Sequence, residues 1–296
     1  MDNSTYADHT MREDLTHASQ RFPISEFVDN FDSFAGRGFP SHWHHEFELQ
    51  ILLHGSAEYN VNGTSYFVKE GSAIYIAPEA VHMARAYTPG TTGYDIVLAP
   101  QFLISILRAA NCEPAADALA SRRPDAFVIT PERKETHAIL ELLKRMYYTE
   151  STSSTYELFL LECLLGIWRN LIALFPRAVN TAEESGKKLR EERMKIMLNF
   201  IRQHYSTPIS VSDIAASAAI SKSECFRCFS ELSERTPIDY VSEFRLLQAA
   251  HLLAATEKSV ADICYETGFN NTSYFSKKFR EQYGVTPKAY RVARME

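Results

Sequence analysis

The C-terminal part of the chain contains a repeat of about 50 residues, and a repeat of this length indicates copies of one supersecondary unit. The segment Ser210–Ile214 matches Ser259–Ile263 at an offset of 49 residues. Further matches occur at an offset of 50, where Phe229, Thr236, Pro237 and Tyr240 correspond to Phe279, Thr286, Pro287 and Tyr290. We therefore expect two copies of one helical unit, one after the other.

Each copy is predicted to form a helix, a short turn and a second helix. The segments Ser210–Asp213 and Ser259–Asp262 resemble capping boxes, in which a side-chain oxygen accepts a hydrogen bond from the first turn of a helix. Gly268 suits the left-handed position that ends a helix. The second helices should begin near Ser221 and Asn271. A helix-turn-helix of this kind can lay its second helix into the major groove of DNA.

Helical periodicity divides each second helix into an inner apolar face and an outer face. A long helix from Pro237 to Ala255 would set the distance between the two units. The outward residues are the candidates for DNA contact, and they are Ser223, Phe226 and Arg227 in the first unit and Thr272, Ser273, Ser276 and Lys277 in the second, with Lys278 beside them as a candidate phosphate contact.

The second unit also carries a family signature. Residues 262–279, followed by residues 283–291 (Tyr-Gly-Val-Thr-Pro-Lys-Ala-Tyr-Arg), closely resemble the signature of AraC/XylS-type regulators. The resemblance covers residues 191–296. It implies an all-α DNA-binding domain of two helix-turn-helix units and a transcription regulator rather than an enzyme, with no cofactor.

Four residues of the first unit differ from those usual in this family. Ala219 stands where this family usually has glycine, which would strain the turn by about 1 kcal/mol if the residue is left-handed. Phe226 is apolar at a position that is usually polar, so it either touches a thymine methyl group or packs locally. Cys225 and Cys228 have the spacing of a metal or redox motif, but the family places core leucines there, which favours core packing.

Composition indicates a globular protein of about two domains, with 45% hydrophobic and 23% charged residues. The net charge of −6 argues against a general nucleic-acid binder, although basic residues outnumber acidic ones within residues 272–296. The N-terminus has no export signal, and the apolar stretch 158–175 contains charged residues, so no membrane partner is expected. Five cysteines without a disulfide pattern favour the cytoplasm.

Residues 21–110 are predicted to form an all-β, cupin-like barrel. Short runs rich in valine, isoleucine, tyrosine and phenylalanine occur at 47–53, 57–61, 64–68, 73–76 and 94–98. Asn62-Gly63 predicts a tight hairpin. Residues 36–55 match the first cupin motif in every spacing, and residues 71–82 match the second more weakly, because Ala77 and Glu79 replace its usual proline and glycine, and Ala86 its asparagine.

Alternation along a strand places His42, His44, Glu46 and Glu48 on the barrel interior, while Trp43, His45 and Phe47 point the other way. His82 would come from a facing strand. Three interpretations of these residues stay open. They bind a small polar effector such as a sugar, which is the use that the family resemblance favours. Alternatively, His42, His44, Glu48 and His82 bind a divalent metal, since imidazole and carboxylate suit Fe, Mn, Ni or Zn. In the third interpretation they are only structural.

The remaining segments complete the predicted organisation. Residues 1–20 are a loose arm, and residues 111–176 are helical. Their apolar stripe from Leu158 to Phe175 is wide enough either to bury one helix on two sides or to form a subunit interface. Residues 177–190 are the linker to the DNA-binding domain at 191–296. The partners expected are a double-stranded DNA operator, a small-molecule effector (a carbohydrate, for example), a second copy of the chain, and RNA polymerase.

Overall fold

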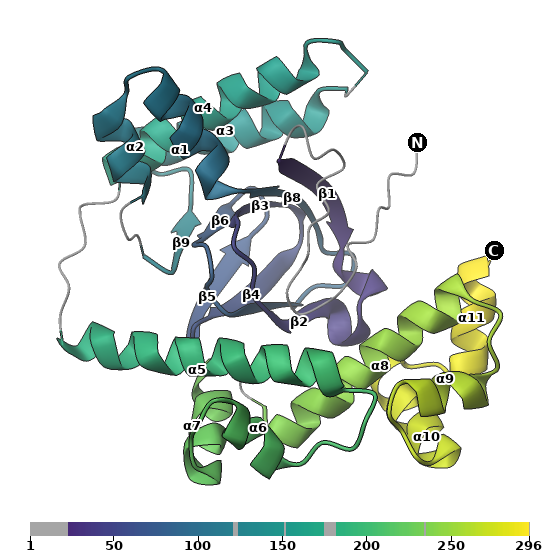
Figure 1. Ribbon diagram of the computed structural model, residues 1–296. Coiled ribbons are helices and arrows are strands. Elements are labelled where there is room, and N and C mark those ends of the chain that lie inside the picture. Colours follow the sequence, from purple (N-terminus) through teal and green to yellow (C-terminus); the bar gives the residue numbers. More distant parts are fainter. Residues whose placement is uncertain (1–22, 121–123, 151, 175–181, 234, 296) are drawn as a thin grey trace.

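The computed structural model describes residues 23–120, 124–150, 152–174, 182–233 and 235–295. In Figure 1, a β-barrel lies between a layer of helices above it and a longer helical region below it. The predicted loose arm, residues 1–20, falls outside the described residues. The architecture of a β-rich N-terminal domain and an all-helical C-terminal domain is the one that the sequence predicts.

Two antiparallel sheets form the barrel. The strands are β1 Ile24–Asn30, β2 Gly38–His42, β3 Phe47–His54, β4 Ser56–Val61, β5 Thr64–Lys69, β6 Ala73–Ile76, β7 His82–Ala86, β8 Thr92–Leu98 and β9 Ala126–Ile129, with two short 3-10 turns, η1 Phe31–Ser33 and η2 Ala35–Arg37, before β2. One sheet has the order β1-β8-β3-β6-β9 and the other the order β2-β7-β4-β5. Within the second sheet His42 pairs directly with His82.

The hairpin predicted at Asn62-Gly63 joins β4 to β5. Val61 pairs with Thr64, and both turn residues are left-handed, with φ of 47° and 79°. This is the backbone that a two-residue hairpin with the twist of a sheet requires. A Cβ at Gly63 would collide with the carbonyl oxygen of Glu231, far along the chain. The hairpin tip therefore touches the C-terminal domain.

The helical layer covers the outer face of the first sheet (Figure 1). It consists of α1 Pro100–Ala109, α2 Glu113–Ala120, α3 Lys134–Tyr148 and α4 Tyr156–Leu174. Phe47 points outward as predicted, and its ring lies 4.3 Å from that of Trp168 on α4. The prediction of helix throughout residues 111–176 was wrong at residues 126–129. This short apolar run pairs with β6 and becomes β9, the edge strand of the first sheet.

The predicted linker, residues 177–190, is helical in its described part. Helix α5 spans Ala182–His204 and runs beneath the barrel. Strong helix formers around Gly186 favour this outcome, and the later turns of the helix supply a packing face. That face, formed by Met194, Met197, Leu198 and Ile201, is fully buried in the C-terminal domain.

The C-terminal domain has two apolar cores joined by one long helix. Its helices after α5 are α6 Val211–Ser217, α7 Lys222–Ser233, α8 Pro237–Ala255, α9 Val260–Glu266, α10 Thr272–Tyr283 and α11 Pro287–Met295. The first half of α8 packs with α5, α6 and α7, and the second half with α9 and α10. The predicted caps are present, because Ser210 and Ser259 accept hydrogen bonds from the backbone of Asp213 and Asp262.

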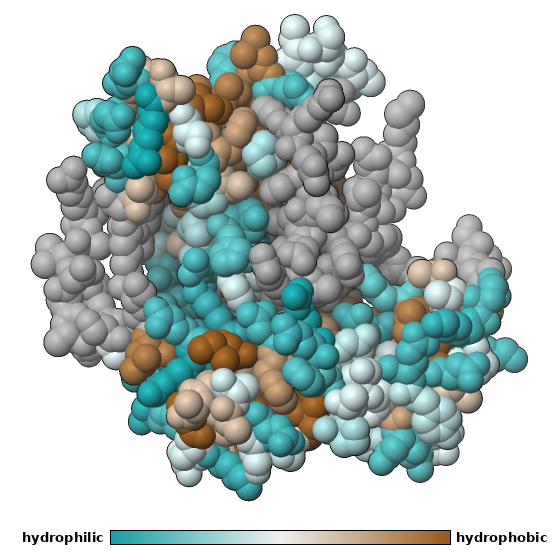
Figure 2. All heavy atoms as spheres, viewed as in Figure 1, coloured by the Kyte–Doolittle hydropathy of each residue, from teal (hydrophilic) through white to brown (hydrophobic). Residues whose placement is uncertain are grey.

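Surface hydropathy differs between parts of the molecule. Figure 2 shows mainly hydrophilic residues over the second unit, α9 to α11, and scattered hydrophobic residues over the helical layer. No helix within the described ranges combines the length and the apolar character needed to span a membrane.

Candidate effector site and DNA interface

Four residues converge inside the barrel. His42 ends β2, His44 follows it, Glu48 lies on β3, and His82 begins β7. Each offers one ligand atom, and these atoms all lie within 4.8 Å of one another. His44, Glu48 and His82 are buried, with 1%, 6% and 3% of their surfaces exposed. We call these four residues the His–Glu cluster.

The carboxylate of Glu48 is the centre of the His–Glu cluster. Its Oε2 lies 3.0 Å from Nε2 of His44 and 2.9 Å from Nε2 of His82. The other ring nitrogens of these histidines lie near backbone carbonyls, 3.2 Å from Glu46 and 2.8 Å from Ala80. Burial opposes ionisation of Glu48, but the charges and hydrogen bonds of His82 and His44 hold its pKa well below the usual value.

The residues of the His–Glu cluster do not lie on one continuous strand. The chain leaves β2 after His42 and enters β3 at Phe47, in the other sheet, so residues 44–46 form the corner. His82 therefore faces Glu48 from the opposite sheet but is the direct neighbour of His42 in its own sheet. Alternation along extended backbone nevertheless predicts correctly that the side chains of His42, His44 and Glu48 point into the barrel. Glu46, at the corner, is not part of the cluster, although its carboxylate lies 3.8 Å from Nδ1 of His44.

A second set of polar residues lies in the barrel beside Glu48, beginning with Gln50 on β3. Gln50, only 2% exposed, donates from Nε2 to Oδ2 of Asp29 at 2.7 Å and accepts a hydrogen bond from the hydroxyl of Tyr59. Asp95, on β8, is paired with Gln50 in register. These residues were not among the site residues predicted from the sequence. The same alternation that selects Glu48 selects Gln50 two residues later, so the signal was present.

The predicted DNA-contact residues of the first unit lie on the outer face of α7. Ser223, Phe226 and Arg227 are all exposed, while Cys225 and Cys228 are fully buried. Arg227 is paired with Glu224 at 2.9 Å and lies 3.9 Å from Glu231. The core position predicted for the two cysteines is confirmed, and burial raises the pKa of Cys225 to about 11.

In the second unit the predicted DNA-contact residues lie on α10. Asn271 caps the helix by accepting from the backbone of Tyr274 at 2.8 Å. Ser273 and Lys277 are exposed, whereas Thr272, Ser276 and Lys278 are half-buried. Lys278 lies 3.3 Å from Glu281. Tyr274, which was not predicted, is also exposed on this helix and extends its outer surface.

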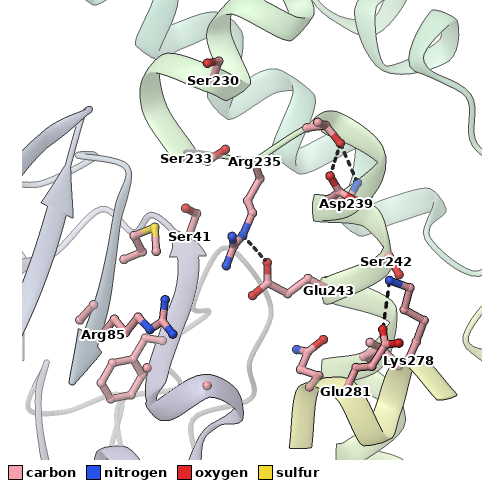
Figure 3. A pocket seen from close by; sticks show the side chains of 18 of the residues that line it. Ser41, Arg85, Ser230, Ser233, Arg235, Asp239, Ser242, Glu243, Lys278 and Glu281 are labelled. Carbon is pink, nitrogen blue, oxygen red and sulfur yellow. Dashed lines mark hydrogen bonds and ion pairs between the residues drawn. The ribbon is translucent and has the colours of Figure 1, made fainter. Parts of the chain in front are cut away.

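A cleft of about 920 Å³ is lined by residues of the barrel and of both second helices, α7 and α10. Figure 3 shows its walls, with Ser41 and Arg85 on the barrel side and α8 and α10 on the other. Arg235 pairs with Glu243 and Lys278 with Glu281 across its polar surface. Phe226 also lines the cleft. Two of the predicted DNA-contact residues, Phe226 and Lys278, therefore face the same cleft as the barrel.

Family models match both the barrel region and the helix-turn-helix region of the chain. A family model described as an AraC-like ligand binding domain matches residues 30–166, and a helix-turn-helix domain model matches residues 214–293. The uncharacterized HTH-type transcriptional regulator YdeC of Bacillus subtilis is 28% identical over 287 residues, covering 96% of this chain and 97% of its own length.

Two further proteins are similar over most of the chain. The HTH-type transcriptional activator RhaS of Mannheimia succiniciproducens is 26% identical over 255 residues, covering 86% of this chain and 90% of its own. Among solved structures, ToxT of Vibrio cholerae aligns with a TM-score of 0.48 and 15% identity over 91% of this chain and 98% of its own.

Proposed function

Because this chain belongs to the AraC family of DNA-binding transcription regulators, with an N-terminal ligand-binding domain and a C-terminal pair of helix-turn-helix units, we propose that it controls transcription in response to a small polar effector bound at the His–Glu cluster. The observation that carries this proposal is the cluster itself, a buried group of polar side chains in the barrel of a chain that also has a DNA-binding domain.

The chemistry of the barrel interior favours a hydroxyl-rich ligand such as a sugar. Imidazole, carboxylate and amide groups together offer both donors and acceptors, and a hydroxyl group can use either. Glu48 and Gln50 lie two residues apart on one strand, so their side chains share one face. A polyol could bridge them.

A divalent metal is the second candidate occupant, and one observation favours it. Ligand atoms from His42, His44, Glu48 and His82 lie within 4.8 Å of one another, and three imidazoles with one carboxylate suit Fe, Mn, Ni or Zn. Nδ1 of His44 and of His82 lies near a backbone carbonyl, which is the usual support for a ligating imidazole.

The effector proposal is tested with the full chain and a DNA duplex that the wild type selects from a random pool. Operator affinity is measured by fluorescence anisotropy with a panel of sugars. We expect one class of sugar to change the affinity in the wild type and not in His44→Ala, while binding without sugar is nearly equal in both. His54→Ala, which alters an exposed histidine, is the matched control. An equal response in His44→Ala would refute the proposal.

Elemental analysis separates the metal from the sugar. The metal is the sensed ligand if the purified wild type holds about one Fe, Mn, Ni or Zn per chain and His44→Ala loses it. Removal of the metal by a chelator should then have the same effect on operator binding as His44→Ala. Retention of the effector response after chelation would exclude the metal as the sensed ligand.

The remaining partners follow from the same proposal. Residues 223, 226 and 227 of α7 and residues 272, 273, 276 and 277 of α10 read base edges, and Lys278 contacts a phosphate. Residues 111–176 form a homodimer, whose two copies would bind neighbouring half-sites. RNA polymerase is the expected protein partner, and the cytoplasm the expected compartment.

A further inference from the structure

The residues that alternate with those of the His–Glu cluster are buried in the C-terminal domain. Trp43 lies between His42 and His44 in the sequence, and Val81 precedes His82. Trp43 is 5% exposed and Val81 is fully buried, and both belong to the apolar core of the first helix-turn-helix unit, with Met197, for example. Successive side chains on extended backbone point to opposite sides. Each of these two short segments therefore places one side chain in the cluster and the next in the DNA-binding domain.

Hydrogen bonds fix the first of these segments to the C-terminal domain. The buried hydroxyl of Tyr240, on α8, donates to the carbonyl oxygen of Ser41 at 2.6 Å. The ammonium group of Lys195, on α5, lies 5.3 Å from the centre of the Trp43 ring, in a cation–π contact. The indole N–H of Trp43 is buried and has no acceptor among the described residues. The indole is therefore held by packing and by the contact with Lys195 rather than by a hydrogen bond.

Glu79 joins the two segments to each other and to α5. Its backbone N–H donates to the carbonyl of His44 at 2.7 Å. Its carboxylate accepts from Lys195 at 2.8 Å and lies 3.4 Å from Nδ1 of His45. The hydrogen bond from Lys195 outweighs the effect of burial and lowers the pKa of Glu79. A movement of His44 is thus passed to α5 through one backbone bond and one ion pair.

The second helix-turn-helix unit has no such connection. Within the described part of the chain, its apolar core contains no barrel residue. The N-terminal domain approaches this unit where η2 contacts α10 and at the cleft, whose walls carry both apolar and charged side chains. A shift of the segments 41–45 and 79–82 would therefore act directly on α7 and on the first half of α8, where Tyr240 lies, but not on the core around α10. The relative placement of the two second helices, which reading two successive major grooves requires, would change.

We propose that Trp43 and Val81 transmit the state of the His–Glu cluster to the first helix-turn-helix unit. This inference rests on the proposed function, since it makes the cluster the sensing site. A ligand shifts an equilibrium only through contacts that differ between two states, and the shift is reciprocal. DNA bound to α7 must accordingly alter the cluster, even when the effector is absent.

Reciprocity allows a test without a known effector. Hydrogen exchange is measured by mass spectrometry on the full chain, with and without a duplex selected by the wild type. We expect exchange in residues 47–50 and 82–86 to change about fivefold or more, the lower end of ordinary coupling, while residues 24–30 are unaffected. In Trp43→Ala, bound to the same duplex at saturation, the change in residues 47–50 and 82–86 should disappear.

Each outcome decides the inference. Unchanged exchange in the wild type, or an equal change in Trp43→Ala, would overturn it. If Trp43→Ala does not fold, Trp43→Phe and Tyr240→Phe replace it under the same criteria, and Trp168→Phe is the control for the other tryptophan, which lies on α4. Failure to select any duplex would instead contradict the proposed function.

Discussion

Ala219 and Gly268 occupy the same turn in the two helix-turn-helix units, and both have left-handed backbone, with φ of 52° and 83°. The hydrogen bonds around them correspond. Ala219 donates to Ala216 and Gly268 donates to Tyr265, both at 3.0 Å. Only glycine adopts this conformation without steric cost, so the first unit carries strain that the second does not.

Replacement of Ala219 by glycine should therefore stabilise the first unit. We expect the free energy of unfolding to rise by less than about 1 kcal/mol, because the greater entropy that glycine gives the unfolded chain offsets part of the relieved left-handed strain. Urea denaturation followed by circular dichroism measures the change. The reverse substitution, Gly268→Ala, should destabilise by more, since its Cβ would collide with the carbonyl of Tyr205 and the side chain of Arg245. A loss of stability in Ala219→Gly would contradict this explanation.

The DNA-binding half could be predicted from the sequence in some detail, because its signals are local. Caps, turn positions and helical periodicity act within a few residues, and Ser210, Ser259, Gly268 and Asn271 all have the predicted roles. Alternation is also a local signal, and it predicted that His42, His44 and Glu48 lie on the interior of the barrel.

Long-range relationships could not be predicted. The burial of Trp43 in the other domain depends on a surface that only the folded chain forms, and nothing near Trp43 in the sequence indicates it. The pairing of β9 with β6 depends on a strand about fifty residues earlier in the chain, beyond the reach of a local pattern. Helix α5, which begins within the predicted linker, is likewise stabilised by the packing face of its later turns.

Glu26 provides a prediction about pH. Burial raises its pKa, although Tyr94 and Tyr156 both donate hydrogen bonds to its carboxylate. A raised pKa in the folded state means that the folded chain binds the proton more tightly, so this contribution to stability is present below pH 4.5 and is lost as the pH rises through the folded pKa. Glu26→Gln should remove this pH-dependent loss. Thermal unfolding of both proteins between pH 4 and 7 measures it, and parallel curves would contradict the prediction.

Arg227 should contribute to base recognition. It is exposed on the outer face of α7, and its pairing with Glu224 orients the guanidinium group without burying it. Arg227→Ala should weaken specific binding by about 1–3 kcal/mol if the guanidinium pairs with a guanine edge. Anisotropy with the selected duplex and with a scrambled duplex provides the comparison. An equal loss on both would show that Arg227 does not read sequence.

Lys278 should act on affinity without affecting specificity. Its ammonium group lies 3.3 Å from the carboxylate of Glu281 on α10, at the cleft, and the sequence predicts a phosphate contact for it. Lys278→Ala should reduce the slope of log affinity against log salt by about 1, because one fewer counterion is released. The preference for the selected over the scrambled duplex should remain. A slope equal to that of the wild type would remove Lys278 from the DNA interface.

Leu158 tests the proposed dimer. It lies on α4, in the apolar stripe of the predicted dimerisation region, and it is 67% exposed in the single chain. Leu158→Glu should convert the dimer to a monomer in sedimentation experiments. The protein concentration is set to tens of micromolar, roughly the Kd of a weak dimer. Ile196→Glu, which alters an exposed apolar residue on α5, is the control. A wild-type chain that is monomeric at this concentration would refute the dimer.

Glu48 should stabilise the barrel even without a bound ligand. Burial disfavours its charge, yet the pKa remains well below the usual value because His82 and His44 surround the carboxylate. Glu48→Gln keeps the shape but leaves the two imidazoles without an anion, and breaking a buried ion pair from one side costs about 3–5 kcal/mol. Calorimetry should show a correspondingly lower unfolding temperature for the barrel. Glu70→Gln, an exposed carboxylate beside His54, should leave it unchanged. If Glu48→Gln is instead as stable as the wild type, the attraction in the His–Glu cluster only offsets the cost of burying its charges, and the cluster is maintained for binding alone.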